Sequence, residues 1–167
     1  MNWKGMDIIM KKVITNIFYI SFLIYIFLLI CVLFLMSRSY NSSLSLFDYI
    51  KRSSNIIPLK TIITYVEAII KGDINMDIPV KNLLGNLVLF FPMGFYMTYS
   101  HRKPLSLKNY TLICILILIC IEVGQILLRR GSFDIDDFIL NISGAIIGFV
   151  FFNLDRVRCF IHNLITN

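Results

Sequence analysis

Apolar runs with almost no charge alternate with charged segments along this chain, and the runs are long enough to cross a membrane. We place four of them, at residues 14–36, 82–99, 110–128 and 138–154. A helix rises about 1.5 Å per residue and a hydrocarbon core is about 30 Å thick, so a span needs about 20 residues. The pattern predicts four transmembrane helices, the last at the short limit. Pro92 should kink the second of them, because proline lacks a backbone donor.

The segment that joins the first two runs has a different pattern. Between Thr61 and Lys71, apolar residues such as Ile62, Val66 and Ile69 recur every three or four positions. This spacing is typical of an amphipathic helix at a membrane surface. The expected fold is therefore all-α: a polytopic membrane protein with four transmembrane helices, plus a surface or re-entrant amphipathic helix between the first two.

The composition agrees with membrane insertion. Hydrophobic residues make up 57% of the chain and charged residues only 16%, whereas a typical soluble domain carries about 25% charged residues. A soluble fold of this length could not bury so much apolar surface, so lipid must cover part of it. Basic residues that flank the apolar runs produce the net charge of +6, which fits anionic lipid headgroups and not nucleic acid.

The basic residues in the short flanking segments decide the expected orientation. With the N-terminus inside, the short outer segments hold only Arg129 and Arg130. The inner segments hold Lys4, Lys11, Lys12, Arg102, Lys103, Lys108, Arg156 and Arg158. Because positive charge favours the cytoplasmic side, we expect both termini in the cytoplasm. The basic residues of the long loop, Arg38 among them, count less, since the rule weakens in long loops.

This orientation predicts how the chain is divided. Residues 1–13 form a cytoplasmic N-terminus and residues 14–36 a transmembrane signal anchor. Residues 37–154 form one domain that holds a long extracellular loop and three transmembrane helices, and residues 155–167 form a cytoplasmic tail.

Polar residues gather at the outer ends of the last three runs. In each run they share one helix face, as Asn82 does with Asn86, four residues on. Three such ends on one side of the membrane predict a polar pocket at the outer leaflet. The candidate binding residues are Asn82, Asn86, Glu122, Gln125, Arg129, Arg130, Asp134, Asp137 and Asn141.

The chemistry of this pocket has more than one interpretation. A carboxylate at Glu122 is costly in lipid unless it is paired or neutral, and Arg129 and Arg130 are its nearest candidate partners. Arginines suit an anionic headgroup, and carboxylates suit Mg²⁺ or Ca²⁺, but acidic residues at a helix start are commonly caps, as we expect for Asp134. We therefore assign no metal and no cofactor.

A purely structural interpretation of these residues also stays open. Polar residues can simply join helices, and Gly144 and Gly148 permit a close helix approach. In this topology the two histidines, His101 and His162, lie on the side of the membrane opposite to the predicted pocket. They cannot act together with its residues, so we name no catalytic residues.

Four stretches that include these residues resemble the VanZ-like family of membrane proteins. They are residues 55–60, 82–94, 122–125 and 130–144, and they occur in the order found in the family. The resemblance implies a small multi-pass protein of the bacterial cell membrane, with residues 37–154 as its VanZ-like domain. It also implies a link to resistance against the glycopeptide teicoplanin, but no catalytic residues.

Three functions remain open from the sequence. The one we favour is a non-enzymatic protein that binds membrane lipid, a lipid-linked cell-wall precursor or a lipoglycopeptide. The alternative is a membrane-embedded enzyme that acts on an anionic lipid or lipid-linked phosphate, with Glu122 and the acidic cluster from Asp134 to Asp137 as acid, base or metal ligands. The third is an assembly partner for another envelope protein.

The orientation can be tested by labelling introduced cysteines from outside the cell. We expect a cysteine at Ser132 to be labelled and one at Ser106 to be protected, with the unmodified chain as the background. Labelling at Ser106 with none at Ser132 would reverse the assignment.

Overall fold

A computed structural model describes residues 3–35, 45–72, 75–100 and 105–166 of this chain. Met36, Arg38, His101, Arg102 and Lys103 lie outside the described residues, as do the side chains of Lys4 and His162.

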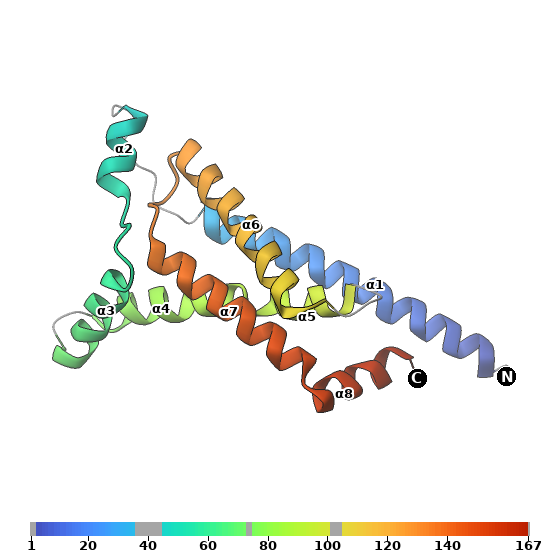
Figure 1. Cartoon of the computed structure of the whole chain (residues 1–167). Helices are drawn as coiled ribbons and strands as arrows, with labels where there is room; N and C mark the ends of the chain where they lie inside the picture. The colour runs from blue at the N-terminus through green and yellow to red at the C-terminus, as the bar shows by residue number, and fades with distance from the viewer. Residues whose placement is uncertain (1–2, 36–44, 73–74, 101–104, 167) are drawn as a thin grey trace.

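Four helical spans in this part of the chain are long and apolar enough to cross a membrane (Figure 1). The first, Ile9–Leu35, combines helix α1 (Trp3–Ile30) with a short π-helical turn, η1 (Cys31–Leu35). The second combines α4 (Asp77–Leu89) with α5 (Phe91–Ser100), and the third and fourth are α6 (Leu107–Leu127) and α7 (Ile135–Asn153). The all-α, multi-pass prediction is confirmed. The second span begins earlier than we expected, because a turn carrying Asp77 and Lys81 extends it.

Helix α7 packs against α4, α5 and α6 and is the centre of the bundle. Glycines let its backbone touch the second span. A Cβ atom added at Gly144 would lie 1.8 Å from the carbonyl oxygen of Leu87, and one at Gly148 would lie 2.1 Å from that of Phe91. A Cβ atom added at Gly94 would lie 2.3 Å from the backbone of Gly148. Such close approach is how helices associate in lipid, where no hydrophobic force drives them together.

The second span is broken at Phe90, which is buried between α4 and α5. Pro92 lies in the first turn of α5, where a helix needs no backbone donor. Pro92 has no N–H group to donate to the carbonyl of Val88. That carbonyl accepts from the backbone N–H of Phe90 instead. The hydroxyl of Tyr25 on α1 donates to the carbonyl of Leu89 at 3.0 Å. The expected interruption is present, and a neighbouring helix satisfies a carbonyl beside it.

The buried interior lies where α6 and α7 meet. Tyr110 is fully buried, stacks on Phe149 with ring centroids 4.3 Å apart, and donates its hydroxyl to the carbonyl of Ala145 at 3.0 Å. Cys114 and Leu118 continue this interior along α6. The first span is much less buried and contacts the bundle through aromatic residues such as Phe22, which packs on Tyr96.

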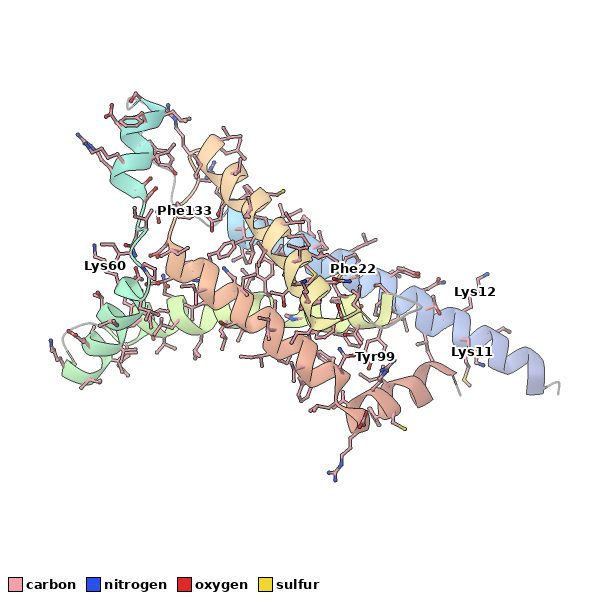
Figure 2. The ribbon with its side chains drawn as sticks, viewed as in Figure 1. Lys11, Lys12, Phe22, Lys60, Tyr99 and Phe133 are labelled. Atoms are coloured by element: carbon pink, nitrogen blue, oxygen red, sulfur yellow. The ribbon has the colours of Figure 1, made fainter. Side chains whose placement is uncertain are left out.

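The predicted amphipathic helix is present as α3 (Lys60–Lys71), preceded by α2 (Leu46–Ser53). Figure 2 shows Lys60 and Phe133 at the end of the molecule opposite to Lys11 and Lys12. On α3, Ile63, Val66 and Ile70 remain exposed, which suits contact with lipid. An additional helix, α8 (Asp155–Thr166), occupies the predicted tail and packs on α7 and α1. The sequence analysis missed it, although Val157, Phe160 and Ile161 have helical spacing.

The close approach of α7 to the second span should not tolerate a methyl group. We expect Gly144→Ala to lower the free energy of unfolding by at least about 1–3 kcal/mol, because the new Cβ atom meets rigid backbone. Gly85→Ala is the matched control, since a Cβ atom there meets nothing within 4 Å. It should be neutral, or stabilising by about 0.5–1 kcal/mol through helix propensity. Thermal unfolding of the purified protein in detergent, followed by far-UV circular dichroism, would show this; equal effects would contradict the contact.

Candidate functional site

The segment before α3 is fastened to the start of α7 by backbone hydrogen bonds. The N–H of Asn55 donates to the carbonyl of Phe133 at 2.8 Å, and the N–H of Ile135 donates to the carbonyl of Asn55 at 3.0 Å. The hydroxyl of Tyr49 on α2 donates to the carbonyl of Gly131 at 2.5 Å. We name residues 45–71, which hold α2 and α3, the outer segment after the orientation predicted from the sequence. These bonds hold it against the loop between α6 and α7.

Asp136 completes this attachment by capping a helix that is distant in the sequence. Its carboxylate accepts the backbone N–H groups of Leu59 at 2.5 Å, Thr61 at 2.7 Å and Ile62 at 3.2 Å. Helix α3 has no side-chain cap of its own, because Leu59 occupies the cap position. A carboxylate at this positive helix end is favourable, and Asp136 is 0% exposed. The sequence analysis placed Asp136 only in an acidic cluster, and no local signal identifies a partner so far along the chain.

Asp134 caps α7, as predicted. Its Oδ1 atom accepts from the backbone N–H of Asp136 at 2.9 Å and from the side chain of Asn55 at 3.1 Å. Its Oδ2 atom accepts from the hydroxyl of Thr61 at 2.6 Å. The oxygens of Asp134 and Asp136 are therefore engaged in holding the outer segment.

A second polar group lies between α4 and α7. The amide of Asn86 donates to the carboxylate of Asp137 at 2.6 Å and joins the two helices. The Oδ1 atoms of Asn82 on α4 and Asn141 on α7 are buried, and neither has a hydrogen-bond partner among the described residues. These four predicted site residues thus come from two helices that pack directly against each other.

Gln125 faces a different neighbour. Its amide donates to the carbonyl of Leu33 at 2.7 Å and joins α6 to the π-helical turn of the first span. It lines a cavity of about 330 Å³. The other lining residues are Val32, Leu33, Lys81, Gly85, Asn86 and Leu89.

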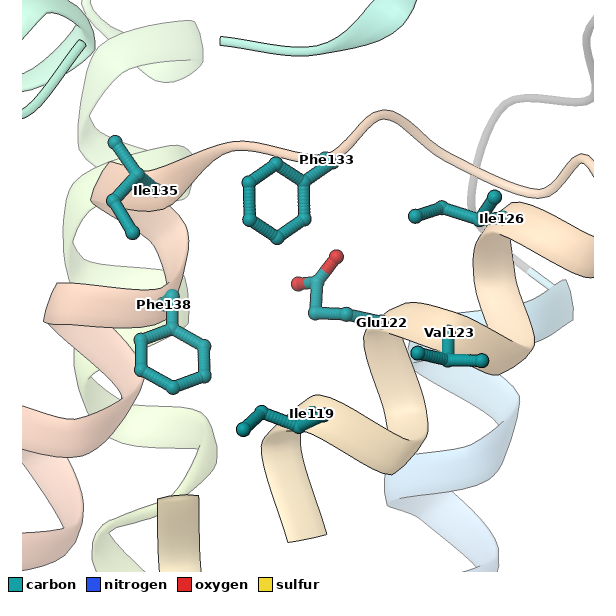
Figure 3. A pocket seen from close by; sticks show the side chains of 7 residues that line it. All are labelled: Ile119, Glu122, Val123, Ile126, Phe133, Ile135 and Phe138. Carbon is teal, nitrogen blue, oxygen red and sulfur yellow. The ribbon is translucent and has the colours of Figure 1, made fainter. Parts of the chain in front are cut away.

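Glu122 faces a separate cavity of about 210 Å³ between α6 and the start of α7. Figure 3 shows its carboxyl group directed into this space, between the rings of Phe133 and Phe138. Glu122 is only 9% exposed, and it is the one polar side chain in the lining. The apolar lining consists of Ile119, Val123, Ile126, Phe133, Ile135 and Phe138.

The arginines that we expected to neutralise Glu122 do not pair with it. In the described part of the chain, the ion pairs are Lys71–Glu67 and Lys81–Asp77, both within single helices. Arg129 and Arg130 follow α6, and the backbone N–H of Arg130 donates to the carbonyl of Gln125 at 2.8 Å.

The predicted residues thus divide among four places: the cap around Asp134, the contact between Asn86 and Asp137, the cavity at Glu122 and the cavity at Gln125. Within the described residues, no group of three or more His, Cys, Asp or Glu side chains is placed to hold a metal ion. The cavity has an apolar lining with the carboxyl group of Glu122 beside it, so it suits a ligand that is mainly apolar. The sequence singled out Glu122 but gave no indication of its aromatic neighbours.

Comparison with known proteins identifies a family. A family model described as VanZ/LLP1 matches residues 22–156, which is most of the chain. No curated protein and no solved structure matches.

The cap on α3 can be tested by removing its acceptor. We expect Asp136→Ala to weaken the attachment by about 1–3 kcal/mol, because buried backbone donors lose their partner. The amides of Leu59, Thr61 and Ile62 should then exchange with deuterium about 5- to 150-fold faster, as measured by mass spectrometry. Glu67→Ala, which removes an exposed carboxylate from the same helix, should leave these amides unchanged. Unchanged exchange in Asp136→Ala would show that Asp136 does not hold α3.

Proposed function

This chain belongs to the VanZ-like family of membrane proteins, and on that basis we propose that it binds a lipid-linked component of the bacterial cell envelope, or a lipoglycopeptide, at the outer leaflet. Membership associates the chain with glycopeptide resistance of the teicoplanin type. Its four apolar spans make it a multi-pass membrane protein. We also propose that the protein lies in the bacterial cell membrane, with both termini in the cytoplasm.

The cavity around Glu122 is the observation that carries this proposal. Ile119 and Val123 line it and are 46% and 49% exposed on α6, so its mouth opens on a surface that faces lipid. An apolar cavity with one convergent polar group is typical of a ligand site. A ligand with an acyl chain can enter this cavity from the membrane without crossing water.

The position of the cavity fits an outer-leaflet ligand. It lies toward the end of α6 and the beginning of α7, next to the loop that α2 and α3 cover. In the predicted orientation, these helix ends face outward. A lipid-linked precursor held there would be shielded from a drug that reaches the same leaflet, and the acyl chain of a lipoglycopeptide would be drawn away from its target.

The membrane-embedded enzyme finds less support in the geometry. It needs several acidic groups free to act on a substrate, yet Asp134 and Asp136 are engaged as caps. Asp137 accepts from Asn86. Glu122 alone does not supply both a general acid and a general base, and the proposed reaction would need one group to accept a proton and another to donate one.

Expression in a susceptible Gram-positive host tests the function. We expect tolerance to teicoplanin to rise more than tolerance to vancomycin. An apolar site in the outer leaflet can bind the lipid chain of teicoplanin, whereas vancomycin has no such chain. The minimal inhibitory concentrations of both drugs are the measurement, with the protein level in the membrane confirmed. Equal or absent shifts for the two drugs would contradict the proposal.

A variant that fills the Glu122 cavity tests whether the teicoplanin effect arises there. Ile119→Trp should abolish most of the teicoplanin effect, because the larger side chain occupies the space that the ligand needs. Leu112→Trp is the matched control, since Leu112 lies two turns earlier on the same face of α6, is 54% exposed and is outside the cavity lining. Both variants should be present in the membrane at equal levels. A full effect in Ile119→Trp would exclude this cavity as the site.

A further inference from the structure

Glu122 is the only charged group in the lining of its cavity, and it has no hydrogen-bond partner among the described residues. A carboxyl group in an apolar site within the membrane is costly unless something compensates it. Other polar groups at this end of the bundle, Asp134, Asp136 and Asp137, have partners from the protein. Glu122 is therefore positioned to receive its partner from a ligand.

The charges around the cavity favour one sign of ligand. The carboxyl groups of Asp137 and Asp134 lie close enough to Glu122 to interact with it electrostatically. In the described part of the chain, no basic side chain forms an ion pair with Glu122. Arg129 and Arg130 are not among the lining residues. A carboxyl group can carry negative charge but never positive charge, so these three groups can attract a cation and offer no positive charge to a phosphate.

The aromatic residues around the carboxyl group suit a cation as well. The rings of Phe133 and Phe138 flank Glu122 (Figure 3). Aromatic ring faces attract ammonium groups, and the attraction is stronger where water is excluded. The remaining lining is aliphatic, and Ile119 and Val123 connect it to the lipid-facing surface of α6. These features together describe a site for a cationic head attached to an apolar chain.

We propose that the Glu122 cavity binds the ammonium group of an amine-bearing amphiphile, with Glu122 as its counter-ion and Phe133 and Phe138 as its aromatic walls. This inference rests on the proposed function in taking the cavity as a ligand site, and it specifies the chemical class of the ligand. The amine belongs either to the headgroup of an outer-leaflet lipid or to another amphiphile that dissolves in the membrane.

The experiment measures the affinity of the full-length protein, purified in detergent, by native mass spectrometry. The first pair of probes is tetradecylamine and tetradecanol, which differ in charge and share one chain. The second pair is phosphatidylethanolamine and its N-acetylated form, which lacks the ammonium group. The proteins are the natural sequence, Glu122→Gln and the control Glu67→Gln, which removes an exposed carboxylate outside the cavity.

We expect the natural sequence to bind the amine at least about tenfold more tightly than the alcohol, as for a charge-assisted hydrogen bond. Glu122→Gln should remove this preference and Glu67→Gln should keep it. A preference for phosphatidylethanolamine over its acetylated form assigns the amine to a lipid headgroup. Equal binding of the two forms, with the alkylamine preference intact, assigns it to another amphiphile.

Two results would overturn the inference: equal affinity of the natural sequence for amine and alcohol, or an amine preference that survives in Glu122→Gln. The first of these needs no variant, so it holds even if Glu122→Gln fails to fold. Because no drug or cell is involved, an amine preference without any effect on teicoplanin tolerance would reject the proposed function alone. A teicoplanin effect without an amine preference would reject only this inference.

Discussion

The contact between the backbone of α7 and the backbone of the second span controls the arrangement of the other elements. Gly144 and Gly148 remove the side chains that would otherwise separate these helices, and Gly94 does so from the opposite side. At this separation, Asn86 reaches Asp137 with a hydrogen bond of 2.6 Å. A wider separation would leave both groups without a partner in hydrocarbon, where each costs several kcal/mol. Close packing and polar pairing therefore depend on one another in this bundle.

The polar residues at the outer end have separate tasks, although they are neighbours in the sequence. Asp134 and Asp136 cap two different helices, and Asp137 joins α7 to α4. Gln125 joins α6 to the first span. Glu122 lies beside a cavity and has no such bond among the described residues, and the buried Oδ1 atoms of Asn82 and Asn141 are likewise without a partner there. Glu122 and the apolar surface around it are therefore the part of this end of the bundle that is open to a ligand.

The sequence predicted the features that depend on local order along the chain. Hydropathy located the four spans, helical spacing located α3, and the residue type at a helix start identified Asp134 as a cap. It could not predict that Asp136 would cap α3, because that bond joins residues far apart and depends on tertiary packing. It also grouped Gln125 with Glu122, although one turn of α6 directs their side chains into different cavities. Helical periodicity places residues on a face, but the neighbouring helices decide what each one contacts.

The cap that Asp136 provides also orders the steps by which the protein is made. Helix α3 leaves the ribosome well before α7, and chains fold broadly from the N-terminus as they are synthesised. Until α7 has crossed the membrane, the first N–H groups of α3 lack the carboxylate that holds them in the finished protein. The hydrogen bonds between the outer segment and the start of α7 can form only once both parts of the chain are in place. A chain without its final span would lack the carboxylate that holds the start of α3.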